Sequence, residues 1–382
     1  MSGIYLHIPF CKQACYYCDF HFSTLLKRKT EMINALIEEL VLRKDENKGE
    51  SIETIYFGGG TPSILSNEEI TVLIQTITAH YTVVENAEIT LEANPDDLST
   101  KKIKELASSP INRLSIGIQS FFDDDLKFMN RAHTASESKK CLSKALKYFD
   151  NITIDLIYGV PNMSCEKWLA NLEQAFAFGV PHISSYALTV EEKTALHSFI
   201  KQGKVPPIDE KLALEHFNIL VEQCEKQGFV HYEISNFGKP GYFSKHNKSY
   251  WLGEKYIGIG PSAHSFNGVK RSWNVSNNAK YLKEIQENKL PSQFEILTVN
   301  NRFNEYIMTG LRTVWGVSFD TIEKEFGALY LEQLKTNVQP FIDKGLLKIQ
   351  HHSFSNNTLI TTKKGKFLAD GIASDLFLVD EV

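Results

Sequence analysis

Apolar residues in the first half of the chain fall into two alternating patterns. Short apolar runs, typical of buried strands, occur six times, at residues 4–8, 52–57, 87–92, 113–118, 152–157 and 182–188. Between them, apolar residues recur at helical spacing over residues 33–41, 70–77, 101–107, 136–148 and 166–178. Thr30 is the expected cap of the first helix, which Gly49 ends, and residues 66–69 (SNEE) form an expected capping box for the second.

Six strand–helix repeats predict an α/β fold with a parallel sheet and right-handed crossovers. If the sheet closes in part into a TIM-type (β/α)6 barrel, the active site lies at the carboxyl ends of its strands. Polar or glycine-rich residues occur at the first five of these strands. In strand order they are the cysteine-containing segment after the first strand, residues 58–62 (GGGTP), residues 92–95 (EANP), Gln119 and Asp155. An open, doubly wound sheet is the alternative on this pattern alone.

The alternation of strands and helices ends before residue 300, and the pattern beyond it predicts a separate C-terminal appendage. Helices are expected at 304–314, 318–326, 331–344 and 366–377, with a hairpin formed by 345–350 and 358–362. This order is typical of a winged-helix-like domain, and we place the boundary between residues 1–295 and 296–382. From residue 301 onward the chain has nine Lys and Arg against ten Asp and Glu, so the basic face of a DNA reader is not expected.

Composition and charge exclude several classes of protein. A net charge of −5 over 382 residues gives no general attraction to nucleic acid or anionic membrane. No apolar run of 18 or more residues could span a bilayer, and the first ten residues lack the pattern of a secretory signal. We therefore expect a cytoplasmic protein that is not an integral membrane protein, with reduced thiols.

Three of the six cysteines are crowded together. Cys11, Cys15 and Cys18 fall within eight residues, whereas the other three are scattered singly. In a reducing compartment this crowding indicates metal or redox chemistry. Thiolates suit iron–sulfur clusters, and three of them leave one iron of a [4Fe-4S] cubane open. The alternative is a zinc site with His7 or His21 as a fourth ligand.

CxxxCxxC after the first strand and GGGTP after the second resemble the radical S-adenosylmethionine superfamily. Within it, the chain is similar to the oxygen-independent coproporphyrinogen III dehydrogenases and to the HemW-type heme chaperones. The resemblance covers nearly the whole chain and rests on residues 5–11, 58–62, 117–121, 154–161 and 246–251. It implies a partial (β/α)6 barrel that binds a [4Fe-4S] cluster and S-adenosylmethionine, with chemistry that begins by reductive cleavage of the sulfonium.

The resemblance also assigns roles to individual residues. Cys11, Cys15 and Cys18 would ligate the cluster. Contacts to S-adenosylmethionine and its surroundings would come from Tyr5, Tyr17, Gly59, Gly60, Thr61, Glu92, Gln119, Arg131, Asp155 and Ala187. The glycines allow close backbone approach, and the arginine suits a carboxylate. Without the resemblance, the glycines are more typical of a turn that ends a strand and the tyrosines of core aromatics, whereas the carboxylates are as typical of capped or solvated groups as of ligand contacts.

Two departures separate the chaperones from the dehydrogenases. The dehydrogenases have a fourth cysteine, CxxxCxxCxC, where this chain has Phe20, and a long segment before the motif, where this chain has ten residues. The chaperones carry an HNxxYW motif associated with heme, which matches His246 to Trp251. His246 would then bind heme, although a structural histidine and a core tryptophan are the alternative. The resemblance implies heme, heme-acceptor proteins and an electron donor as partners, with homodimerisation possible; oxidative decarboxylation of a porphyrinogen is the alternative activity.

Overall fold

Residues 2–351 and 357–379 are described by a computed structural model. One curved sheet of twelve strands forms its centre, in the order β12-β11-β10-β9-β1-β2-β3-β4-β5-β6-β8-β7. Seven strands pair in parallel. Six of them are those that the pattern predicts: β1 (Ser2–Ile8), β2 (Ser51–Gly59), β3 (Thr82–Ala93), β4 (Arg113–Gln119), β5 (Ile152–Tyr158) and β6 (His182–Ala187). The seventh, β9, pairs with β1 on its other side.

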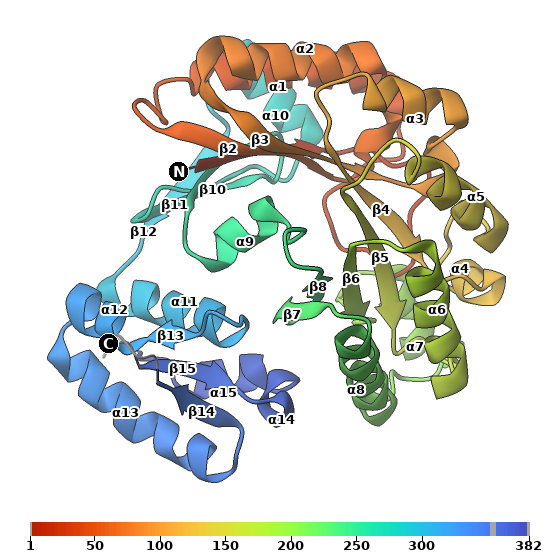
Figure 1. The fold of residues 1–382 in the computed structure, drawn as a ribbon. Coiled ribbons are helices and arrows are strands. Elements are labelled where there is room, and N and C mark those ends of the chain that lie inside the picture. The colour runs from red at the N-terminus through yellow and green to blue at the C-terminus, as the bar shows by residue number, and fades with distance from the viewer. Residues whose placement is uncertain (1, 352–356, 380–382) are drawn as a thin grey trace.

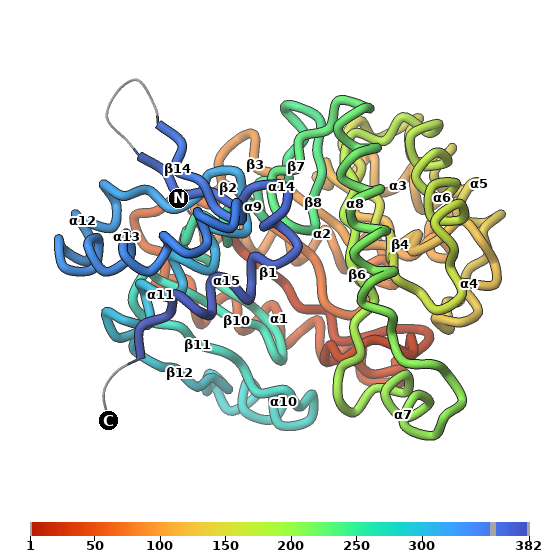
Figure 2. Tube along the Cα trace, turned by 90° about the horizontal axis from the view of Figure 1, so that it is seen from below, coloured from red at the N-terminus to blue at the C-terminus, as the bar shows by residue number. Residues whose placement is uncertain are grey.

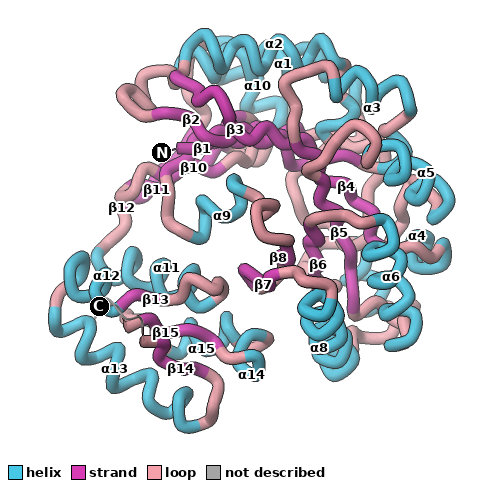
Figure 3. The backbone as a smooth tube through the Cα atoms, viewed as in Figure 1, coloured by secondary structure: helices cyan, strands magenta, loops and turns pink. Residues whose placement is uncertain are grey.

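Helices cover the outer face of this sheet, and Figure 1 shows them outside its curve. They are α1 (Lys29–Leu42), α2 (Asn67–His80), α3 (Thr100–Ala107), α4 (Asp123–Phe128), α5 (Ala135–Ala145), α6 (Cys165–Phe178) and α8 (Glu210–Lys226), with α7 (Ala195–Lys201) beside the rim. Because the helical layer covers one face and the sheet curls, the fold is a partial barrel. The doubly wound alternative is therefore wrong (Figure 3).

The boundaries of the first elements follow local capping chemistry. Ser66 caps α2 as predicted: its hydroxyl accepts from the Glu69 amide, and the Glu69 carboxylate accepts from the Ser66 amide. The predicted cap at Thr30 is wrong, because a 3₁₀ turn at Leu26–Arg28 leads directly into α1 and places Thr30 inside the helix. Helix α1 also ends at Leu42, well before Gly49.

Residues 189–300, for which the pattern predicts no element, extend the sheet at both edges. On one side lie β7 (Val230–Glu233) and β8 (Asn236–Gly238); on the other lie β9 (Lys255–Ile259), β10 (His264–Phe266), β11 (Lys270–Asn274) and β12 (Ser292–Ile296). Helix α10 (Asn278–Gln286) packs on α1, whereas α9 (Lys245–Trp251) lies inside the curve of the sheet (Figure 1). The segment predicted to bind heme is thus an internal helix.

The C-terminal part has its own apolar core, which includes Phe303, Ile307, Leu334 and Leu359. It comprises α11 (Val299–Leu311), β13 (Val317–Ser318), α12 (Phe319–Phe326), α13 (Ala328–Asp343), β14 (Leu347–Gln350), β15 (Thr358–Thr361), α14 (Lys363–Lys366) and α15 (Ala369–Asp375). The predicted final helix is therefore two short helices. The division at residues 295 and 296 stays a prediction.

The C-terminal part lies between the two edges of the barrel sheet. Figure 2 shows it on the opposite side of the molecule from α4 and α5. On one edge, the Val314 amide donates to the Tyr232 carbonyl at 3.0 Å. On the other, the Arg271 guanidinium of β11 lies 2.6 Å from the Glu305 carboxylate of α11. Within the described ranges, no helix has the length and apolarity needed to cross a membrane.

Candidate functional site

The segment carrying the cysteines leaves the carboxyl end of β1 and is held by the end of β2. The Gly60 amide donates to the Ile8 carbonyl at 2.9 Å, and the Thr61 amide donates to the Phe10 carbonyl at 2.7 Å. These bonds continue the strand pairing past the sheet. They fix where the segment begins relative to GGGTP.

None of the three glycines of GGGTP has room for a side chain; at Gly58 a Cβ would lie 2.8 Å from Cε2 of Tyr5. A Cβ on Gly60 would lie 2.5 Å from the Phe10 carbonyl oxygen and 2.8 Å from that of Ile8. Gly59 has a φ of +103°, and a Cβ there would lie 2.6 Å from Nδ1 of His7. Gly60 is therefore needed for the close approach of this backbone to the start of the cysteine segment, and Gly59 for its approach to the His7 ring of β1.

Two side chains, Thr61 after β2 and Arg131 after α4, contact two of the cysteine sulfurs. The Thr61 hydroxyl donates to Cys11 Sγ at 3.3 Å, and Arg131 Nη1 donates to Cys15 Sγ at 3.2 Å. Asn94 joins these donors, because its Nδ2 lies 3.3 Å from Thr61 Oγ1 and its Oδ1 accepts from Arg131 Nη2 at 2.6 Å. Asn94 was not among the predicted site residues, although its place at the polar end of the third strand was the available signal.

The cysteine segment is anchored at further points along its length. Gln13 Nε2 donates to the Asn130 carbonyl at 2.9 Å, and Asn130 Nδ2 donates to the Ala14 carbonyl at 2.7 Å. The Tyr16 amide donates to the Met129 carbonyl, and Lys12 forms an ion pair with Asp97. The positions of the three sulfurs are thus set by several elements.

All three cysteines are half-buried and unpaired by disulfides. Desolvation raises the pKa of Cys18 to about 11 and also raises that of Cys11, so both would be thiols in the absence of a cation. Binding of iron stabilises the thiolate form, and the hydrogen-bond donors from Thr61 and Arg131 suit thiolate sulfurs. The donor set fits an iron–sulfur cluster.

A mononuclear zinc site does not fit the same residues. Across residues 2–351 and 357–379, no group of three His, Cys, Asp or Glu side chains converges as a single metal ion requires. Both nitrogens of His7 are engaged, with the Tyr5 hydroxyl at 3.3 Å and the His21 carbonyl at 2.8 Å. His21 Nε2 lies 2.7 Å from Asn278 Oδ1. A cubane needs no such convergence, because each cysteine ligates a different iron.

Glu92 and Asp155 face the interior of the barrel and line a small polar cavity. The Tyr56 hydroxyl donates to Glu92 at 2.8 Å, and Ser115 donates to Asp155 at 3.4 Å. Desolvation raises the pKa of Glu92 to about 8 and that of Asp155 to about 6. A cation or a hydrogen-bond donor that binds beside these carboxyls would favour loss of their protons and formation of carboxylates. Tyr56, which the pattern did not single out, orients Glu92.

The other predicted contacts surround this rim. Gln119, at the end of β4, has a φ of +64°, and Arg131 Nη2 donates to the adjacent Gly117 carbonyl at 3.0 Å. Arg131 Nε is buried without a hydrogen-bond partner, so the guanidinium has a donor to spare for an anion. Tyr17 interacts with Arg131 and Cys15, and desolvation raises its pKa. Ala187 ends β6 beside Tyr158.

The structure buries His246 behind the wall of the large cleft, among Thr54, Tyr56 and Tyr250. The side chain is 1% exposed, with Nδ1 2.7 Å from the Thr54 hydroxyl and Nε2 2.7 Å from the Tyr250 hydroxyl. Its ring stacks on Tyr56 at 4.9 Å, and burial lowers its pKa to about 3. Since both ring nitrogens are already engaged, binding of a heme iron by His246 would require both bonds to break. A role of His246 in heme binding stays a prediction.

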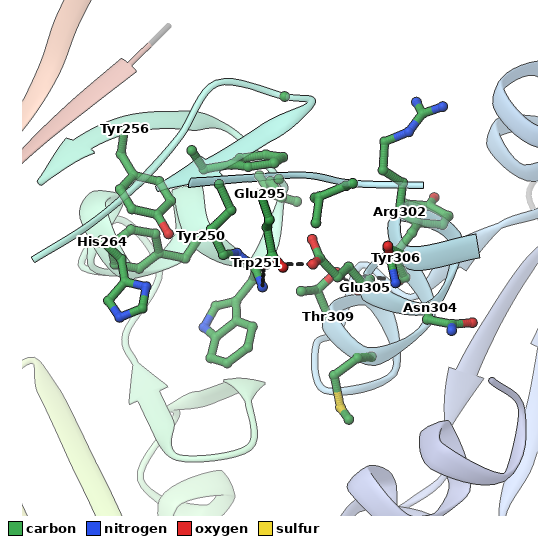
Figure 4. Close-up of a pocket in the computed structure, with 18 of the residues that line it drawn as sticks. Tyr250, Trp251, Tyr256, His264, Glu295, Arg302, Asn304, Glu305, Tyr306 and Thr309 are labelled. Atoms are coloured by element: carbon green, nitrogen blue, oxygen red, sulfur yellow. Dashed lines mark hydrogen bonds and ion pairs between the residues drawn. The ribbon is translucent and has the colours of Figure 1, made fainter. Parts of the chain in front are cut away.

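A much larger cleft of about 1330 Å³ opens between the barrel and the C-terminal part. Tyr5, Gly59 and Glu92 reach it from the barrel, and Phe20 lies at its edge. The last two residues of the HNxxYW segment, Tyr250 and Trp251, also line it (Figure 4). The predicted site residues are therefore adjacent to a chamber large enough for an extended aromatic ligand.

The sequence of this chain is similar to two protein-family models and to full-length relatives. The model of the radical SAM superfamily matches residues 5–185, and that of the HemN C-terminal domain matches residues 297–365. Heme chaperone HemW of Bacillus subtilis is 32% identical over 97% of this chain and 98% of its own length. Heme chaperone HemW of Lactococcus lactis is 33% identical over 100% of this chain and 98% of its own.

The structure of coproporphyrinogen III oxidase (HemN) from Escherichia coli has the same fold. It superposes with a TM-score of 0.84 at 21% identity and covers 98% of this chain and 90% of its own. At that identity the likeness establishes the fold alone. The full-length similarity to the chaperones is what assigns the family: the chain belongs to the HemW family of the radical SAM superfamily.

Proposed function

We propose that this chain is a heme chaperone that binds a [4Fe-4S] cluster and S-adenosylmethionine and delivers heme to acceptor proteins. The observation that carries the proposal is Phe20. It occupies the place of the fourth cysteine of the dehydrogenases, is 67% exposed and lines the large cleft. The names of the full-length relatives support the same function.

The cysteine rim would hold the cluster, with Cys11, Cys15 and Cys18 each ligating one iron. When bound, the cluster supplies an electron and one iron with an open coordination position. Thr61 and Arg131 donate hydrogen bonds to two of the sulfurs, which tunes the cluster and orients its ligands. The electron comes from a donor protein that docks on this chain.

The residues beside the rim would bind S-adenosylmethionine. Gly59, Gly60 and Thr61 offer backbone groups to its methionine part, and the spare donor of Arg131 faces its carboxylate. The remaining contacts, to its amino group, ribose and adenine, come from Tyr5, Tyr17, Glu92, Gln119, Asp155 and Ala187. We place the chaperone in the cytoplasm and allow for a homodimer.

Cluster binding is tested by anaerobic reconstitution with iron and sulfide. Cys11→Ser, Cys15→Ser and Cys18→Ser are each expected to lose most of the iron and the visible absorption of the cluster, because each removes one of three ligands. Cys165→Ser is the matched control, since Cys165 lies at the start of α6 and contacts Glu215 of α8 instead of the cysteine segment. Equal iron retention by the rim variants and the control would contradict the assignment.

The alternative enzyme activity is tested with coproporphyrinogen III, reductant and S-adenosylmethionine. A chaperone is expected to form no protoporphyrinogen under conditions in which an authentic dehydrogenase is active. The same preparation is titrated with heme and is expected to bind it saturably. Turnover of the porphyrinogen without saturable heme binding would overturn the proposed function in favour of the dehydrogenase.

A further inference from the structure

Three histidines line the large cleft, and they differ in how their ring nitrogens are used. His7 has both nitrogens hydrogen-bonded, and His21 has one bonded to Asn278. The imidazole of His264 forms no hydrogen bond with any residue in the described ranges. His264 is therefore the cleft imidazole with both nitrogens available to a ligand.

Strand pairing explains why His264 points into the cleft. It is the first residue of β10, and Phe266, two residues on, faces the same side of the strand. Ser265, between them, faces the opposite side and bonds Arg43 Nη2 at 3.1 Å. His264 is exposed, and its ring lies against Trp273, its partner on β11, at 6.1 Å and 30°.

Aromatic rings continue the same wall of the cleft. Tyr250 meets Tyr256 edge to face at 4.6 Å, and Tyr256 lies 6.4 Å from Phe266. Figure 4 shows His264, Tyr250, Tyr256 and Trp251 on the barrel side. Tyr306 and Thr309 of α11 lie on the other side, where Met308 also lines the cleft. A flat, largely apolar macrocycle suits a chamber with two such walls.

We propose that heme binds in this cleft with His264 as an axial ligand of its iron, an inference that rests on the proposed function. Two further observations support it. Desolvation and the nearby Arg271 guanidinium lower the pKa of His264, which keeps the ring neutral, as iron ligation requires. Arg302 also lines the cleft, and its guanidinium is a suitable partner for a propionate carboxylate.

His246 then acts by positioning. Its Nε2 bonds the Tyr250 hydroxyl at 2.7 Å, which fixes a ring of the cleft wall. Loss of His246 is expected to weaken heme binding without changing the iron ligand. Loss of His264 is expected to change the ligand itself.

The test titrates ferric heme anaerobically into the cluster-loaded protein and records the difference spectrum and the electron paramagnetic resonance of the heme. His264→Ala is expected to change the axial-ligand signature and lower affinity on the order of tenfold or more. His264→Cys is expected to give the spectrum of a thiolate-ligated heme. His21→Ala, in the same cleft, and His246→Ala are expected to keep the wild-type ligand signature. Cluster absorption and circular dichroism verify that each variant folds.

The outcomes separate this inference from the proposed function. If wild type binds heme saturably and both His264 variants keep its ligand signature, His264 is not the ligand, while the chaperone function stands. If His246→Ala instead changes the signature, the motif histidine is the ligand and the inference is overturned. If wild type shows no saturable binding, the proposed function fails and the inference fails with it.

Discussion

At the scale of single residues, the barrel interior holds two carboxyls in a partly protonated state. Glu92 and Asp155 line one small cavity and interact with each other, and desolvation raises both pKa values. Their positions could be predicted, because each lies in the last four residues of a strand. Their pKa values could not, because each depends on the balance between burial, which raises it, and hydrogen bonds from Tyr56 or Ser115 on neighbouring strands, which lower it.

Glu92 gives a prediction for the pH dependence of stability. The folded protein keeps the Glu92 proton up to about pH 8, whereas an ordinary glutamate loses it near 4.5. Between these values the folded state binds more protons, so the free energy of unfolding falls as the pH rises. Glu92→Gln is expected to reduce that fall by ~1 kcal/mol or more, measured by denaturant unfolding at about pH 5 and about pH 8.

Glu38→Gln provides the control, since Glu38 lies on the exposed face of α1. It is expected to leave the pH dependence of the unfolding free energy as in wild type. The same pH dependence in Glu92→Gln as in the control would mean that Glu92 is an ordinary solvated carboxylate.

The site residues differ in how far each could be predicted from the sequence. Cys11, Cys15 and Cys18 are identified by spacing alone. Asn94 lies in the predicted polar end of the third strand, whereas His264 becomes visible only when the strands at the sheet edge are placed in space. His246, which a motif singled out, is a buried residue whose two nitrogens are already used.

At the scale of elements, the junction of β2 with the cysteine segment is the tightest part of the site. The pattern predicted six of the seven parallel strands because each of the six is a continuous apolar run. It missed β7 to β12, which have three to five residues and no periodicity to detect. The functional rim therefore followed from the sequence, whereas the edges that frame the large cleft did not.

Gly60→Ala tests the junction. The new Cβ would meet two backbone carbonyl oxygens, those of Phe10 and Ile8, so the cysteine segment must shift. We expect a loss of ~1–3 kcal/mol in the free energy of unfolding and a reduced iron content after reconstitution. Denaturant unfolding and iron analysis measure the two effects.

Gly371→Ala is the matched control for that substitution. Gly371 lies in α15, and no heavy atom stands within 4 Å of its Cβ position. Alanine favours helix, so this variant is expected to be neutral or slightly stabilising. If both glycine variants behave alike, the close approach at Gly60 is not a constraint on the site.

At the scale of the whole molecule, the C-terminal part spans the opening of the barrel and forms the second wall of the cleft. The sequence predicted its helices and hairpin but not its docking, since docking depends on side chains far apart in the chain. Arg271 and Glu305 form one such contact, half-exposed and 2.6 Å apart. Arg312 forms another, over the ring of Trp251 at 5.0 Å.

Arg271→Ala is expected to loosen this wall without unfolding the barrel. The substitution leaves Glu305 without its partner near Glu295, so hydrogen exchange should rise in α11 and stay unchanged in β2. Lys280→Ala, which removes an exposed pair within α10, is expected to leave α11 unaffected. Unchanged exchange in α11 of Arg271→Ala would show that the docking does not depend on this pair.

The claim that this chain carries heme beside a three-cysteine cluster is tested most directly by an anaerobic heme titration of the reconstituted wild-type protein. We expect a Soret band that saturates in proportion to the amount of protein, with heme and cluster eluting together on gel filtration. An absorbance that rises without saturation, with heme eluting apart from the protein, would contradict the claim.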